Sequence, residues 1–233
     1  ISEQLTAQII LQGEILALYT KDFDSVQTFK KARDLVNPAI LKKELRFDLI
    51  RIIKLVNTEN YEKADTALHR AYSLYRNSDL RRVRHRAVDF VHFLAKLAKD
   101  PAWHQKWMQF AAQEHLKGYQ YRMNEGWSIP VDEKLYLADF VIDLVRIKDI
   151  PLDLKFRVFQ LIQELQISYS GYRSVNFSLT KKGDMSINRL QQNLDENTMY
   201  ISVLNGTHKS ITWAISKNKQ GILESDLGLK DLN

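Results

Sequence analysis

The densest group of residues that could do chemistry is the basic run Arg81-Arg82-Val83-Arg84-His85-Arg86. Guanidinium groups grip phosphates, so such a run can bind a nucleic-acid backbone or serve as an import signal. The apolar stripe of a helix passes through the run, however, and leaves Arg81, Arg84 and His85 on one outward flank. Few aromatic residues are nearby for base stacking. We therefore interpret the run as a solvated helix face, with contact to an acidic partner as the alternative.

The histidines and carboxylates have no spacing that is typical of a metal or acid–base site. Glu114-His115 lacks the second histidine of a His-Glu-x-x-His zinc motif. Asp139 and Asp143 lie one helical turn apart beside an apolar stripe, which indicates a polar helix face rather than an acid–base pair. We expect every histidine to be structural or exposed; they are His69, His85, His92, His104, His115 and His208.

Trp103 and Trp107 are the last candidates, again one helical turn apart. Such a pair can stack on a ligand, but its place in an apolar helical stripe favours packing in the core. The chain has no Cys, no Gly-rich phosphate loop and no Gly-x-Ser-x-Gly elbow. The sequence therefore predicts no catalytic residue, no cofactor and no metal site within these 233 residues.

The elements that carry these residues are predicted to be mainly helical. Gly (8) and Pro (4) are scarce, which favours helices over a turn-rich β fold. The net charge of +6 eases contact with an acidic partner without specifying one. No apolar run approaches the ~18 residues of a membrane span. Apolar residues at helical spacing predict about eight helices, at residues 5–20, 23–36, 38–56, 58–74, 79–98, 103–121, 135–145 and 151–162.

Two of these helices begin alike, which indicates a repeat. Residues 21–26 resemble residues 59–64, and the two segments lie 38 residues apart. The pattern Tyr-x2-Ala-x3-Leu-x2-Ala that starts at Tyr61 resembles the second helix of a tetratricopeptide unit, whose small residues admit a partner helix. The earlier copy is degenerate, because Phe29 and Ala32 are one residue out of step. We therefore expect an irregular tetratricopeptide-like α-solenoid.

The periodicity changes after residue 168. Alternation predicts a strand at 172–179, a short helix follows at 187–194, and two further strands at 199–204 and 210–215 flank a turn. That turn contains Asn205-Gly206, which tolerates the positive φ of a tight hairpin.

A lone hairpin is marginal in water, so we expect this one to pack on the helices or join a larger sheet. The expected organisation is a helical-repeat domain at 1–168 and, at 169–233, the start of a second domain. The chain also begins at Ile1 rather than at a methionine, which we interpret as the sign of a longer parent protein.

The order of helices, strand 172–179, the short helix with Arg189-Leu190-Gln191-Gln192-Asn193-Leu194, and the hairpin resembles a junction in separases. There a helical region meets a caspase-like protease domain, and bacterial tetratricopeptide–CHAT proteases have a similar junction. The resemblance implies a non-catalytic scaffold that supports a cysteine endopeptidase in chromosome segregation. For a separase, the implied partners are the securin inhibitor, the cohesin kleisin substrate and the rest of the protease. The catalytic His and Cys of such proteases lie beyond the hairpin, so none is assigned here.

Two other hypotheses stay open, the tetratricopeptide–CHAT counterpart and a free-standing helical-repeat adaptor that binds peptides. In each case we expect protein partners rather than nucleic acid or a membrane, and a place in the cytoplasm or nucleus. The segment alone is predicted to have no peptidase activity. We also expect Val203→Asp to lower solubility or stability, because one face of its strand should be buried.

Overall fold

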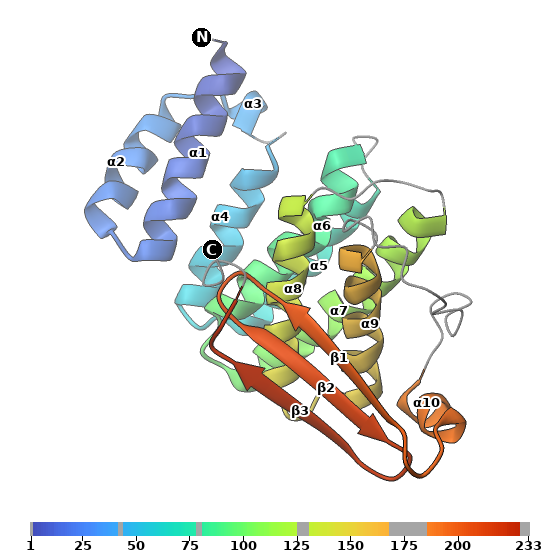
Figure 1. The fold of residues 1–233 in the computed structure, drawn as a ribbon. Helices are drawn as coiled ribbons and strands as arrows, with labels where there is room; N and C mark the ends of the chain where they lie inside the picture. The colour runs from blue at the N-terminus through green and yellow to red at the C-terminus, as the bar shows by residue number, and fades with distance from the viewer. Residues whose placement is uncertain (1, 42–43, 78–80, 125–130, 168–185, 229–233) are drawn as a thin grey trace. The chain divides into compact units, whose positions relative to one another are not determined.

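The computed structural model of the chain describes residues 2–41, 44–77, 81–124, 131–167 and 186–228 (Figure 1). Within these ranges the fold is mainly α and ends in an antiparallel sheet. The helices are α1 (Glu3–Thr20), α2 (Phe23–Asp34), α3 (Pro38–Leu41), α4 (Leu45–Asn57), α5 (Tyr61–Arg76), α6 (Arg81–Leu97), α7 (Pro101–Asn124), α8 (Val131–Arg146), α9 (Leu152–Ile167) and α10 (Ile187–Asn193). The strands are β1 (Met199–Asn205), β2 (Ser210–Ser216) and β3 (Gln220–Ser225).

The predicted helices are confirmed with one correction, since the helix expected over 38–56 is divided into α3 and α4. Glu44 has an extended backbone there, and its carboxylate accepts hydrogen bonds from Gln8 at 3.1 Å and from Arg46 at 3.5 Å. The predicted hairpin is also confirmed, but β3 extends it to a three-stranded sheet. The strand expected at 172–179 lies outside the described residues.

The chain forms two compact units, Ile1–Met108 and Gln109–Asn233, and α7 runs through the division. The second unit contains α8, α9, α10 and the sheet. The boundary expected between residues 168 and 169 falls where the structure is not described, and it stays a prediction.

The first unit repeats one helix–turn–helix geometry. Lys21 ends α1 and Glu59 follows α4, and each has a left-handed backbone with φ of 58°. In both turns the next N–H reaches back five residues, from Asp22 to the Ala17 carbonyl and from Asn60 to the Leu55 carbonyl, each at 2.9 Å. This is a common way to satisfy the last carbonyls of a helix. The likeness noticed between the two segments, 38 residues apart, is therefore a repeated turn.

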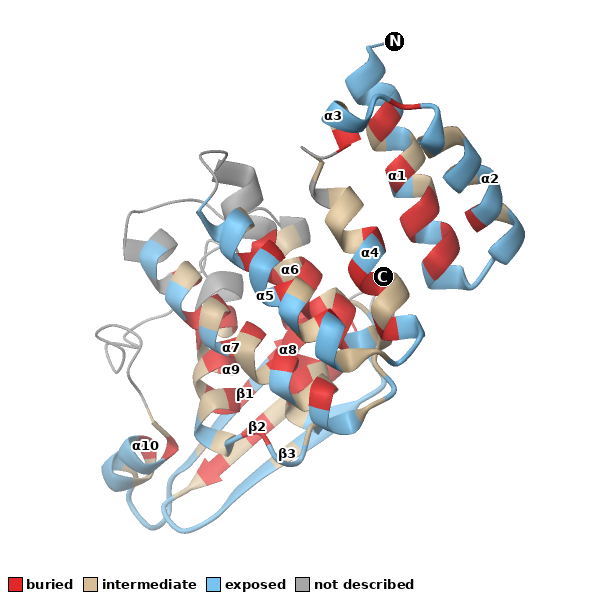
Figure 2. Cartoon of the chain, turned by 180° about the vertical axis from the view of Figure 1, so that it is seen from behind, coloured by how far each residue is buried: buried red, intermediate tan, exposed pale blue. Residues whose placement is uncertain are grey.

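A buried ion cluster joins three helices of the first unit. The Glu14 side chain of α1 has no exposed surface, and its carboxylate accepts hydrogen bonds from Arg33 of α2 at 2.6 Å and from Lys54 of α4 at 2.7 Å. A buried carboxylate is tolerated only when it is paired, so this contact fixes how α1, α2 and α4 pack. Gly13, next in sequence, leaves space for the Phe29 ring of α2. Figure 2 shows the buried stripe of α1.

In the second unit, α8 and α9 form a helical pair that carries the sheet (Figure 1). Lys155 of α9 reaches the end of α8, where its buried ammonium group donates to the carbonyls of Val145 and Ile147. Burial lowers the pKa of Lys155, and nearby Asp149 opposes that shift. The short helix α10 also contacts the sheet, since Gln191 Nε2 donates to the Ser216 carbonyl at 3.1 Å. In the described ranges, none of the helices is long and apolar enough to cross a bilayer.

Candidate interaction surface on the sheet

The sheet has strand order β1-β2-β3, and both pairings are antiparallel. Side chains alternate between the two faces of a strand, so every second residue points toward α8 and α9. These inward side chains include Leu204, Ile211, Trp213 and Ile215, none of which has exposed surface. The inward face is therefore part of the core of the second unit.

Aromatic packing holds the inward face to α9. The Trp213 ring lies 5.0 Å from the Phe156 ring and 5.7 Å from the Phe159 ring, measured between centroids. Tyr200 of β1 meets Phe156 edge-on at 6.4 Å, and its hydroxyl donates to Gln163 at 3.4 Å. Large buried rings contribute several kcal/mol in such positions, about 3–5 kcal/mol each on truncation. The sheet is thus firmly docked rather than loosely attached.

Asp139 of α8 anchors the turn between β1 and β2. Its carboxylate accepts hydrogen bonds from the Thr207 N–H at 2.8 Å and from the Thr207 hydroxyl at 2.6 Å. A Cβ on Gly206 would lie only 2.5 Å from Asp139 and 2.6 Å from Ile142, so a glycine is needed for this close approach. Asp139 was interpreted from the sequence as part of a polar helix face, and the structure adds that this carboxylate holds the turn between β1 and β2.

Arg146 of α8 anchors β3. Its guanidinium donates to both oxygens of Glu224, with the shortest distance 2.6 Å. The hydrogen bond from Arg146 lowers the pKa of Glu224, and the same contact raises the pKa of Arg146. Both side chains are more than a third exposed, so solvent weakens the pair. The sheet therefore has a strong anchor at one turn and a weaker one along its third strand.

The outward face of the sheet carries exposed apolar side chains beside small polar ones such as Ser210 and Ser216. Its exposed side chains are Met199 (57%), Ile201 (62%), Val203 (46%) and Leu223 (67%). Thr212 and Ala214 of β2 lie between them, opposite Val203 and Ile201. We name this set, Met199, Ile201, Val203, Thr212, Ala214 and Leu223, the outer patch. Val203 was expected on the buried face; its neighbours Ser202 and Leu204 are the buried residues instead.

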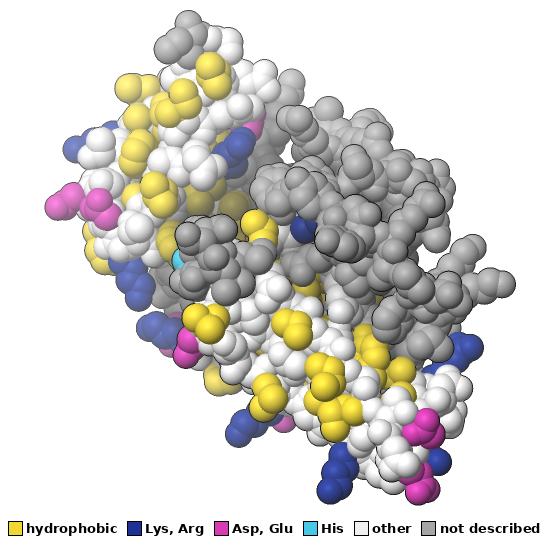
Figure 3. All heavy atoms as spheres, viewed as in Figure 1, with side chains coloured by type: hydrophobic (Ala, Val, Ile, Leu, Met, Phe, Trp, Pro, Cys, Tyr) yellow, Lys and Arg dark blue, Asp and Glu magenta, His cyan; other side chains and the backbone are white. Residues whose placement is uncertain are grey.

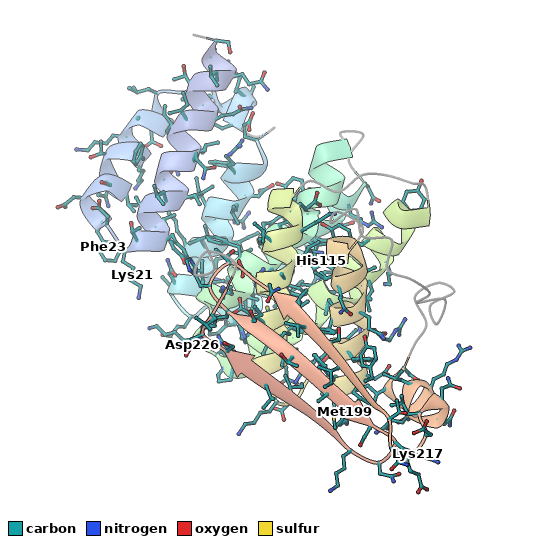
Figure 4. All side chains as sticks on the ribbon, viewed as in Figure 1. Lys21, Phe23, His115, Met199, Lys217 and Asp226 are labelled. Atoms are coloured by element: carbon teal, nitrogen blue, oxygen red, sulfur yellow. The ribbon has the colours of Figure 1, made fainter. Side chains whose placement is uncertain are left out.

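Figure 3 shows hydrophobic side chains gathered over the sheet where it faces the viewer. Figure 4 places Met199 at one end of β1, with Lys217 near it at the turn between β2 and β3 and Asp226 beyond the far end of β3. Charged residues thus lie at the ends of the sheet and the exposed apolar residues lie along it. An apolar surface with a polar rim is typical of a protein-interaction site.

The other candidates from the sequence are dispersed. Trp103 and Trp107 are buried, as predicted, with ring centroids 5.9 Å apart, and Tyr61 packs on Trp103 at 5.7 Å. The Trp107 indole N–H donates to Asp65 at 3.0 Å, and Lys106 donates to the same carboxylate at 2.7 Å. These contacts bind α5 to α7, so the tryptophan pair is core packing rather than a ligand site.

The histidines that the structure describes are scattered and do not form a cluster. His92 and His115 are buried. His69 stacks on Trp107 at 4.6 Å, and His104 Nδ1 lies 2.7 Å from the Ala95 carbonyl. His208 is exposed beside the turn. His85 and the rest of the basic run at 81–86 have side chains outside the described part of the structure.

Among the described residues, no group of three or more His, Cys, Asp or Glu side chains could hold a metal ion. Comparisons of the chain with protein-family models, curated proteins and solved structures found no match. The outer patch and the edge of β1 are thus the described features that could bind a partner. Sequence reasoning had missed β3, for which Ile222-Leu223 after the turn-prone Lys217-Asn218-Lys219 was the available signal.

Proposed function

We propose that this chain is the non-catalytic helical scaffold of a separase-like cysteine endopeptidase, and that its sheet joins the protease part of that enzyme. The observation that carries the proposal is a sheet that α8 and α9 cover on one face and that exposes Met199, Ile201, Val203 and Leu223 on the other. An antiparallel sheet with one wet face normally alternates apolar and polar residues, whereas β1 has apolar residues on both of its faces. The outer patch therefore favours a second layer of protein over it.

The helices support the proposal in a second way. The pairs α1–α2, α4–α5 and α8–α9 are helical hairpins, and the first two share the same turn geometry. An irregular tetratricopeptide-like solenoid would continue this arrangement and offer surfaces for a securin-like inhibitor or a kleisin substrate. The site of action would then be the cytoplasm or the nucleus. The tetratricopeptide–CHAT counterpart uses the same arguments and differs in its partners.

A free-standing adaptor is the second candidate, and one observation favours it. The face of α1 turned away from α2 and α4 is apolar and exposed, with Leu5 (48%), Ile9 (58%), Leu16 (60%) and Tyr19 (52%) at helical spacing. Such a stripe is suited to bind an amphipathic helix, without any protease. The adaptor would use this stripe, whereas the scaffold would use the sheet.

The test uses the full-length product of the gene that encodes the chain. We expect it to cleave protein substrates in a cysteine-dependent way, and residues 1–233 alone to cleave nothing. Thr212→Asp combined with Leu223→Asp places two charges under the protease part, which should lower cleavage about tenfold or more. Leu74→Asp, on a side chain of α5 with 57% exposure, is the matched control and should cleave normally. A product without cysteine-dependent cleavage, or one indifferent to the sheet variant, would contradict the proposal.

A further inference from the structure

We propose that β1 is a docking edge, to which a partner protein adds an extended segment as a fourth strand of the sheet. The segment would have apolar residues at alternate positions. This inference rests on the proposed function only in treating the sheet as an interaction element, and it names where and how the contact is made. Three features of β1 support it. Backbone groups at the edge of β1 are unpaired among the described residues, its sequence has neither a charge nor a proline, and hydrogen bonds fix both of its ends.

The backbone of β1 presents unpaired groups at the edge. The Gly206 N–H donates to the Lys209 carbonyl at 2.8 Å, which fixes the alternation of bonded and non-bonded pairs along the hairpin. By that alternation Leu204, Ser202 and Tyr200 exchange hydrogen bonds with β2. The N–H and C=O groups of Ile201 and Val203 therefore point away from β2, and no described residue pairs with them.

The sequence of β1 carries none of the usual protection of a sheet edge. Exposed edges are normally guarded by a charged side chain, a proline or a bulge. The seven residues Met199–Asn205 contain no charge and no proline, and the register with β2 runs without a bulge. The opposite edge, β3, carries Glu224 paired with Arg146 and has Gly221 opposite Ala214. The edge at β3 thus carries a charged residue, whereas the edge at β1 carries none and is open to another strand.

Both ends of β1 are held in place before any partner arrives. At its start, Asp195 accepts hydrogen bonds from the Thr198 hydroxyl at 2.7 Å and from the Asn197 N–H at 3.0 Å, which closes a tight turn. At its other end, Asp139 holds Thr207. A strand fixed in this way loses little entropy on binding.

An extended peptide is the occupant that the chemistry selects. A helix or an acyl chain could cover the exposed side chains of Ile201 and Val203, but neither could bond to the row of N–H and C=O groups beside them. A peptide strand satisfies those groups, and its alternate side chains continue the outer patch. Apolar residues at every second position are therefore expected in the partner segment.

The test measures binding of a fluorescein-labelled peptide, Lys-Thr-Val-Thr-Ile-Thr-Val-Thr-Lys, to the purified chain by fluorescence anisotropy. Ile201→Pro deletes an outward N–H that β2 does not use, and Val203→Lys adds the kind of charge that guards natural edges. Each should weaken binding by about tenfold or more. Gln220→Pro makes the matching change at an outward N–H of β3, and we expect wild-type binding.

A control peptide tests whether binding depends on backbone hydrogen bonds. A peptide N-methylated on alternate amides should not bind, because it cannot complete the ladder. If Ile201→Pro disturbs the circular dichroism spectrum, Val203→Lys, at an exposed side chain, decides alone. Equal binding of the N-methylated peptide, equal damage from Gln220→Pro, or a chain that dimerises through β1 and ignores the peptide would overturn the inference. The proposed function would survive, since its test changes Thr212 and Leu223 on the other strands.

Discussion

Both faces of β1 carry apolar residues, but they differ in what they contact. The inward face packs Trp213 and Leu204 on α8 and α9, while the outward face leaves Ile201 and Val203 about half exposed or more. Hydrophobicity alone therefore does not determine which face of β1 is buried. A slip of one residue would exchange the faces, so another interaction must set the register.

Polar contacts supply that register. Thr207 can reach Asp139 only when Gly206 lies against Ile142, and this places Leu204 rather than Val203 on the inward face. Along β3 the Arg146–Glu224 pair marks the same orientation. Apolar burial therefore supplies most of the stability, while a few hydrogen bonds to α8 determine which face is buried.

A charge placed on each face in turn should have the largest effect on stability. Leu204→Asp buries an unpaired carboxylate in the core, and we expect it to lower the free energy of unfolding by about 4 kcal/mol or more. Val203→Asp, one residue away, places the same charge on the outer patch and should cost about 1 kcal/mol or less. Urea unfolding followed by tryptophan fluorescence measures both, because Trp213 is buried on the same inward face as Leu204. Equal losses would mean that the two faces are equally buried.

The anchor at the turn is expected to have a smaller effect. Asp139→Ala removes the acceptor of two hydrogen bonds from Thr207, and hydrogen bonds to a charged group contribute about 1.5–3 kcal/mol. We expect a loss in that range, with faster amide exchange in β1 and β2. Asp226→Ala is the control, because its carboxylate is 92% exposed and its ion pair with Lys209 is on the surface. A loss at Asp139 no larger than at Asp226 would show that the turn does not need its anchor.

The helices and the hairpin could be predicted from the sequence because their signals are local. Apolar spacing locates α1, and Asn205-Gly206 locates the hairpin, although the turn that closes it is centred on Thr207 and His208 and needs no positive φ at Gly206. At the division between α3 and α4, Glu44 has an extended backbone, and its partner Gln8 is 36 residues away in the sequence. Asp139 likewise looks like any surface carboxylate until Thr207 is brought to it, 68 residues later in the sequence. Such contacts between distant residues leave no local pattern, which is why the buried face of β1 was predicted wrongly.

The smallest expected effect is the loss of stability at low pH that comes from the Arg146–Glu224 pair between α8 and β3. The hydrogen bond from Arg146 lowers the pKa of Glu224 in the folded chain, so the unfolded chain binds that proton more readily. The pair therefore stabilises the fold above the ordinary glutamate pKa, and this stabilisation is lost as the pH falls through the lowered value. Glu224→Gln removes the titrating group, so its stability should fall less than that of the wild type between about pH 7 and about pH 3. Urea midpoints for the two proteins at both pH values measure the difference. An identical loss of stability in the two proteins would mean that the Arg146–Glu224 pair does not help to position β3. The apolar inward face alone would then hold β3, and only the hydrogen bonds at Asp139 would determine which face of the sheet is buried.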